Sequence, residues 1–225
     1  RNSYPSDIFY THARLMERAG NFITDKGEAS ITCLTVAETS QGDLSGYIET
    51  NLMSMTDGHL YFDKDLFYLG RRPAINPFLS VTRVGRQTQT NLRREVSREI
   101  MSFLNLYEKL QSFIHFGAEL NENVKATIAT GEMIIHFFTQ ATAEVVPINL
   151  QIIAFSMLWA NLWERKDTAV IRKQLHQILE AYSSDKKIRE RIDKLAEIDS
   201  FNKLLGVLKV EGPKIIKIVS QKYGN

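Results

Sequence analysis

The sequence predicts an α/β segment over residues 1–90, followed by an all-α helical bundle over residues 91–225. Two observations predict this division. Residues 29–37 and 79–84 are rich in Val, Ile and Thr, which favour strands. From Leu92 onward, apolar residues recur at steps of three and four in one stretch after another, as in packed helices. A chain of 225 residues can hold one large domain or two small ones.

The first element is expected to be an amphipathic helix within residues 5–22, where apolar residues keep a helical spacing until Gly20 and Gly27 end it. Residues 29–37 (ASITCLTVA) then predict a strand buried on both faces, as in a parallel sheet. Cys33 lies in this run, where no CxxC pattern or nearby histidine marks a nucleophile. We therefore expect it to be a small buried hydrophobic residue.

The rest of the α/β segment alternates turn signals with short elements. Residues 38–58 predict a polar loop that ends in an Asp-Gly turn, and residues 59–62 predict a second strand. A short helix is expected over residues 63–69, followed by an extended segment at residues 79–84. Helix, strands and an extended segment without a complete set of crossovers resemble the back half of an α/β domain.

The bundle is expected to contain five or six helices. The apolar stripe from Leu92 to Ile114 predicts the first, a core-facing helix of about seven turns that Gly117 closes. On its polar face, Glu95 and Glu99 are expected to be solvated rather than to form an acid and base pair.

Capping residues and apolar spacing mark the later helices. Asn123 is the predicted N-cap of the second helix and Asp167 that of the fourth. The third lies in the apolar window of residues 149–163, which polar residues interrupt too often for a membrane span. A fifth helix carries apolar residues from 188 to 208, and a last short helix follows Pro213.

Several kinds of chemistry find no support in the residues. The net charge is +2, and neither GxxxxGK[ST], HExxH, CxxC nor GxSxG occurs. The five histidines show no metal-ligand spacing, so no metal site is expected. The C-terminal lysines alternate with apolar residues and have no aromatic stacking partners, which argues against nucleic acid as a partner. Independent catalysis is not expected.

A family resemblance comes from residues 38–85, ETSQGDLSGYIETNLMSMTDGHLYFDKDLFYLGRRPAINPFLSVTRVG. This stretch resembles the alpha subunit of F-type ATP synthases, the non-catalytic nucleotide-binding subunit. Upstream RNSYPSDIFYTHARLMERAG and downstream YEKLQSFIHFGAELN are similar to the same family. TNLMSMTDGHLYF and RPAINP distinguish alpha from beta subunits, while Arg71 and Arg86 depart from the usual pattern, as in a divergent alpha-like paralogue.

The resemblance implies the end of a P-loop (RecA-like) nucleotide-binding domain followed by the C-terminal helical domain. It also implies a subunit that alternates with catalytic beta subunits around the central stalk gamma subunit, together with a peripheral stalk. Such a complex is peripheral to the membrane, at its cytoplasmic face or the organelle equivalent. The full-length subunit would bind ATP or ADP with Mg, whereas no tightly bound nucleotide is expected on these 225 residues.

The resemblance also supplies site residues. Arg83 matches the arginine of the family's SVSRVG motif, which reaches across the subunit interface to the nucleotide on beta. Phe67, Arg72, Pro73 and Gln140 match positions near the adenine of alpha's own non-catalytic nucleotide. A second glutamine of the family is replaced here by a threonine, at residue 142, and ATAEVVP replaces the pattern that follows. Tight binding of that nucleotide is therefore not expected.

An alternative reading is a stand-alone helical interaction module that derives from an alpha-like subunit. Arg83 separates the two readings. A residue that acts on a neighbouring subunit has to be exposed, whereas a scaffold would tolerate its burial or pairing.

Overall fold

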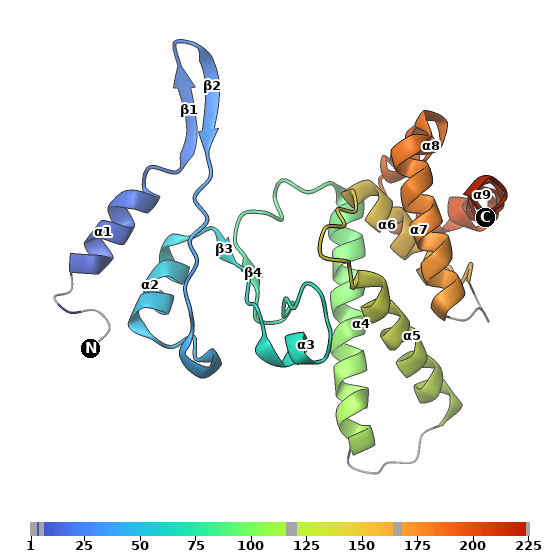
Figure 1. Ribbon diagram of the computed structural model, residues 1–225, viewed down its shortest axis with the longest axis horizontal. Helices are drawn as coiled ribbons and strands as arrows, with labels where there is room; N and C mark the ends of the chain where they lie inside the picture. Colours follow the sequence, from blue (N-terminus) through green and yellow to red (C-terminus); the bar gives the residue numbers. More distant parts are fainter. Residues whose placement is uncertain (1–3, 5–6, 116–120, 164–167, 224–225) are drawn as a thin grey trace. The chain divides into compact units, whose positions relative to one another are not determined.

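The computed structural model describes residues 4, 7–115, 121–163 and 168–223 (Figure 1). The chain forms two compact units, one of residues 1–70 and 74–87, the other of residues 71–73 and 88–225. A short α/β region is thus followed by a mostly helical region, and the predicted fold class is confirmed.

The first unit opens with helix α1 (Asp7–Met16) and a hairpin of strands β1 (Gly20–Thr24) and β2 (Gly27–Ile31). The two strands pair antiparallel, and every residue of both is exposed (Figure 1). Gly27 has a φ of 113°, a backbone conformation that glycine adopts without strain, so the chain can reverse within two residues.

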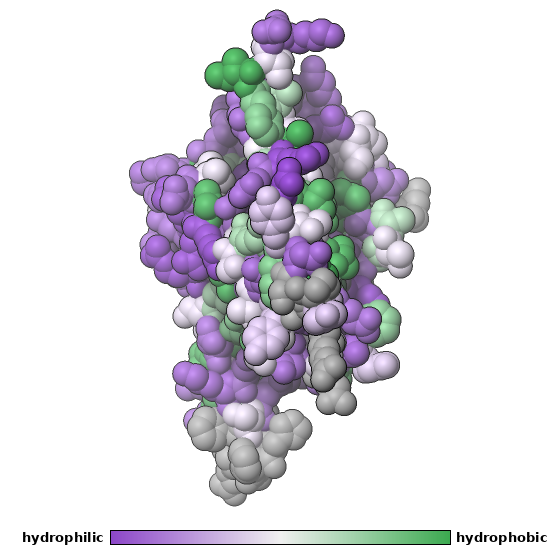
Figure 2. Space-filling model, turned by 90° about the vertical axis from the view of Figure 1, so that its left-hand side faces the viewer, coloured by the Kyte–Doolittle hydropathy of each residue, from purple (hydrophilic) through white to green (hydrophobic). Residues whose placement is uncertain are grey.

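The predicted amphipathic helix is confirmed as α1, which ends at Met16. Two predictions for this stretch are wrong, because residues 29–37 are not a strand buried on both faces and Cys33 is exposed. The physical reason is that the hairpin satisfies the backbone of residues 20–31 locally. Among the described residues, no parallel strand lies beside residues 29–37 to cover them. On the side of the molecule that Figure 2 presents, hydrophobic residues are interspersed with hydrophilic ones.

The second half of this unit contains a 3-10 turn (Ser40–Gly42), helix α2 (Tyr47–Met55), strand β3 (Gly58–His59), helix α3 (Lys64–Tyr68) and strand β4 (Val81–Thr82). Helix α2 contacts α1, and the loop predicted over residues 38–58 is therefore wrong in its second half. The short helix at residues 63–69 is confirmed, and Asp63 caps it by accepting hydrogen bonds from Asp65 N and Leu66 N. The second predicted strand is shorter than expected, with one further bridge from Phe62 to Ile75.

The second unit contains helices α4 (Asn91–His115), α5 (Glu122–Phe138), α6 (Ile148–Trp159), α7 (Thr168–Ser184), α8 (Lys186–Ala196) and α9 (Phe201–Tyr223). The long first helix and the third helix are confirmed. Asn121, not Asn123, caps α5 by accepting from Val124 N at 2.9 Å. The predicted ends at Gly117 and Asp167 lie outside the described residues.

The fifth predicted helix divides at residues 197–200 into α8 and α9, and Pro213 lies inside α9 instead of before a last helix. Proline in a helix interior costs about 3 kcal/mol. Here buried residues on both sides of it, Leu208, Ile215 and Val219, offset that cost. At the division, Glu95 on α4 accepts a hydrogen bond from Phe201 N at 2.7 Å, so Glu95 is not simply solvated.

Helix α6 lies at the centre of the core, with residues 152–158 all buried and contacts to α4, α7, α8 and α9. Phe155 stacks against Phe138 from α5 and Phe201 from α9, with ring centroids 6.2 Å and 6.4 Å apart. Helices α4 and α5 form an antiparallel pair (Figure 1). This pair approaches closely at Gly131, where a Cβ atom would overlap the Tyr107 ring.

Candidate functional site

Arg83 directly follows strand β4 and is exposed. Its backbone N donates to the carbonyl of Asp57 at 2.8 Å, and its guanidinium Nη1 donates to the carbonyl of Ser54 at 3.0 Å. Ser54 lies in the last turn of α2, where the negative end of the helix dipole favours a cation. The exposed side chain is thus held at one guanidinium nitrogen.

The backbone around Arg83 depends on close pairing of β3 with β4. A Cβ atom on Gly58 would overlap the carbonyl of Val81, so only glycine permits this approach. His59 Nε2 lies 2.9 Å from the carbonyl of Leu79, and Ser80 Oγ accepts from Tyr61 N at 3.0 Å. Side chains and backbone therefore fix the strand that leads to Arg83.

A guanidinium in this position suits a phosphate ligand. It stays charged at any relevant pH and offers planar, forked donors that match two phosphate oxygens. The contact with Ser54 uses one donor and leaves further N–H groups on the exposed side chain.

Phe67 lies on α3, in the first unit, and is 51% exposed. Its ring meets the Tyr68 ring edge to face, with centroids 6.0 Å apart. Aromatic rings can pack against a base, and the role of Phe67 toward adenine stays a prediction.

Arg72, Pro73 and Gln140 belong to the second unit. The structure brings two of them together, because Gln140 N donates to the carbonyl of Arg72 at 2.8 Å. Arg72 Nη1 donates to the carbonyl of Arg71 at 2.7 Å. The roles of these residues toward adenine stay a prediction.

Arg71 lies near α4, where its charge acts on Tyr107 and Glu108. Burial raises the pKa of the Tyr107 hydroxyl, and the Glu132 charge raises it further, while Arg71 opposes the shift. Burial also raises the pKa of Glu108, against the effect of Arg71. The cation therefore compensates for charge and burial on this helix surface.

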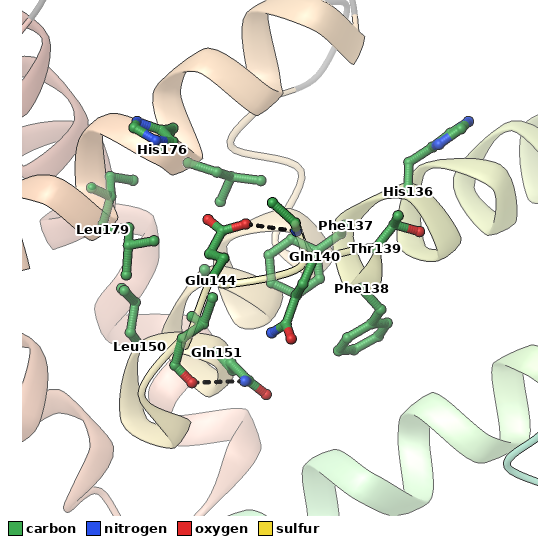
Figure 3. Close-up of a pocket in the computed structure, with 15 residues that line it drawn as sticks. His136, Phe137, Phe138, Thr139, Gln140, Glu144, Leu150, Gln151, His176 and Leu179 are labelled. Carbon is green, nitrogen blue, oxygen red and sulfur yellow. Dashed lines mark hydrogen bonds between the residues drawn. The ribbon is translucent and has the colours of Figure 1, made fainter. Parts of the chain in front are cut away.

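The Gln140 side chain lines a cavity of about 370 Å³ between the end of α5, the following segment, α6 and α7 (Figure 3). Arg72 and Pro73 are not among the described residues that line it. Within the described residues, no cluster of three or more His, Cys, Asp or Glu side chains could hold a metal ion. In the same part of the chain, no helix is both long and apolar enough to cross a membrane.

Comparison with known proteins decides the family. Residues 1–82 match the ATP synthase alpha/beta family, nucleotide-binding domain, and residues 89–207 match the ATP synthase alpha/beta chain, C terminal domain. The chain belongs to the ATP synthase alpha/beta family. The predicted family resemblance is thereby confirmed.

Two similar relatives are both named ATP synthase subunit alpha. The chain is 38% identical over 187 residues to ATP synthase subunit alpha of Helicobacter pylori (strain Shi470), covering 80% of this chain. It is 37% identical over 195 residues to ATP synthase subunit alpha of Acholeplasma laidlawii, covering 85% of this chain. The chain spans only 37% and 39% of the length of these two relatives.

Arg83 lies between the two ranges that match the family, so its role depends on the motif resemblance and on its geometry. The sequence did not reveal that carbonyls of Ser54 and Asp57 hold Arg83. Only the Asp57-Gly58 turn signal pointed to this neighbourhood, because backbone acceptors leave no mark on residue type.

Proposed function

We propose that this chain is part of an alpha-type, non-catalytic subunit of a rotary ATP synthase, and that Arg83 acts in trans on a nucleotide bound by a beta subunit. The exposed, backbone-anchored Arg83 carries the proposal. Family membership and the identity to alpha subunits support it. In this proposal, beta subunits, the gamma subunit of the central stalk and a peripheral stalk are the partners.

The chemistry of phosphoryl transfer explains the need for an arginine. Negative charge spreads over the γ-phosphate oxygens in the transition state, and little covalent chemistry is left for the protein to perform. A fixed cation from a neighbouring subunit stabilises this charge without reorganising at the moment of reaction. Catalysis then depends on how two subunits meet, which suits a machine whose interfaces open and close in turn.

In the same proposal, the full-length subunit binds ATP or ADP with Mg at a site of its own, to which Phe67, Arg72, Pro73 and Gln140 contribute adenine contacts. The nucleotide-binding family match supports this proposal in general terms. The threonine at residue 142 removes one amide hydrogen-bond partner, so the contribution of this chain to nucleotide affinity is expected to be weak.

The test is Arg83→Lys in the subunit that contains this chain, assembled with beta and gamma subunits. Lysine keeps the charge but offers a single point donor, so we expect turnover to fall by about a hundredfold or more. Nucleotide affinity at the catalytic site should change much less, because the contact strengthens as charge develops. Steady-state turnover and equilibrium nucleotide binding, measured on the same assemblies, give both quantities.

Arg86→Lys is the matched control, because Arg86 is exposed and lies three residues further along the chain. It should leave turnover within about threefold of the wild type, within the spread expected of an ordinary surface substitution. If Arg83→Lys behaves like this control, Arg83 does not act on the nucleotide. The scaffold reading would then be the better account.

A further inference from the structure

The cavity beside Gln140 is lined mainly by residues to which the proposed function assigns no role. Its walls come from the end of α5, residues 139–146, α6 and α7, and its volume of about 370 Å³ is in the range of small-molecule sites. Apolar side chains supply most of the wall: Phe137, Phe138, Val146, Leu150, Leu175 and Leu179. An apolar ligand would therefore meet mostly apolar side chains there.

Two polar side chains in the wall are oriented by backbone hydrogen bonds. Glu144 Oε2 accepts from Ala141 N at 3.1 Å, and Gln151 Nε2 donates to the carbonyl of Val146 at 2.8 Å. The Gln151 amide keeps its oxygen as an acceptor beside one further N–H, and Glu144 keeps a second carboxylate oxygen. Both side chains stand in the wall of the cavity (Figure 3).

The charged side chains in the cavity wall indicate which ligands fit. The described residues that line the cavity include Glu144 but no lysine or arginine. Figure 3 shows Glu144 between α7, with His176 and Leu179, and the segment that carries Gln140, whereas His136 is turned away. An anion would find no lysine or arginine in this lining, and a donor with positive charge would form a charge-assisted hydrogen bond with Glu144.

We propose that this cavity binds a hydrophobic amine, a small molecule with an apolar ring body and one protonated amino group. The ring lies between the α6 and α7 side chains Leu150, Leu175 and Leu179, and the ammonium group donates to the Glu144 carboxylate. The amide oxygen of Gln151 offers a second acceptor for the same group.

The test uses 1-naphthylmethylamine and its neutral counterpart 1-naphthalenemethanol, titrated against the whole chain and followed by saturation-transfer NMR. A ligand of this size is expected to bind with a dissociation constant on the order of a millimolar or tighter. The amine should bind about tenfold more tightly than the alcohol, the difference that one charge-assisted hydrogen bond makes.

Three variants locate the binding. Glu144→Gln keeps an acceptor for Ala141 N but removes the charge, so it should weaken the amine about tenfold and leave the alcohol nearly unchanged. Leu179→Trp fills the cavity and should abolish the binding of both probes. Glu180→Gln makes the same change of charge at an exposed residue of α7 outside the cavity and should alter neither.

Equal affinity for amine and alcohol would overturn the proposal, and so would amine binding that survives both Glu144→Gln and Leu179→Trp. Circular dichroism of each variant shows whether the bundle still folds. If Leu179→Trp does not fold, the selective effect of Glu144→Gln decides the question by itself.

Discussion

Glu211 on α9 is held by two cations, Arg191 from α8 and Lys214 one turn further along α9. The hydrogen bond from Arg191, and next that from Lys214, lower the pKa of Glu211 to about 2. A carboxyl group with a lowered pKa in the folded state stabilises the fold above its unfolded pKa, about 4.3 for glutamate. This stabilisation is lost as the pH falls from there through about 2.

Glu211→Gln should therefore lower the thermal unfolding midpoint at pH 7 but have much less effect near pH 2, where the wild-type carboxyl is about half protonated. Thermal unfolding followed by circular dichroism between pH 7 and pH 2 measures the difference. Glu190→Gln is the control, because Glu190 lies 3.7 Å from Lys186 in an exposed pair that contributes little. A difference between wild type and Glu211→Gln that stays constant with pH would contradict the assignment.

Among the elements, the contact between α4 and α5 depends on Gly131. A Cβ atom there would overlap the ring of Tyr107, which is itself buried and cannot move aside. Gly131→Ala should lower the free energy of unfolding by about 1–3 kcal/mol, in spite of the better helix propensity of alanine. Urea unfolding followed by circular dichroism at 222 nm measures this change.

Gly206→Ala on α9 provides the comparison. Nothing lies within 4 Å of a Cβ atom at this helical position, so the substitution should raise the free energy of unfolding by about 0.5–1 kcal/mol. If both alanine variants change the free energy of unfolding in the same direction, overlap with the Tyr107 ring does not determine the effect of Gly131→Ala.

How far an element could be predicted depended on its length and on where its partners lie in the sequence. Helix α4 was predictable because 25 residues carry one continuous apolar stripe, and α3 because Asp63 marks its start. Helix α2 was missed because its sequence, YIETNLMSM, is short and none of its residues is buried. The division between α8 and α9 was missed because Glu95, 106 residues away, accepts the Phe201 N–H.

The residues of the candidate site and of the cavity were also hard to predict where distant parts of the chain position them. Arg83 was identified through its motif, but its anchoring by Ser54 depends on tertiary structure that residue types do not encode. Glu144 lies in the segment before α6, and Gln151 lies in the first turn of α6. Both were missed because backbone hydrogen bonds orient their side chains. Spacing in the sequence gives no signal for such contacts.

At the scale of the whole molecule, the two units differ in how many of their residues are buried. The helices of the second unit enclose a core that includes Phe155, Ile134 and Leu204, whereas α1, α2 and α3 contain no buried residue. Between the β1–β2 hairpin and residue 39, the chain forms no helix or strand, and Leu34 is 86% exposed. Segments without backbone hydrogen bonds or buried contacts open most easily.

Limited chymotrypsin digestion of the whole chain should therefore cleave first within residues 32–39, at Leu34, and leave a resistant fragment that contains α4 to α9. Leu104 and Tyr107 on α4 are the internal comparison, because both are chymotrypsin sites but both are buried in the core. Mass spectrometry of the early fragments identifies the order of cleavage. Cleavage at Leu104 or Tyr107 before Leu34 would show that the helical unit opens as readily as the first unit. The burial of its helices would then not make the second unit the more stable part of the chain.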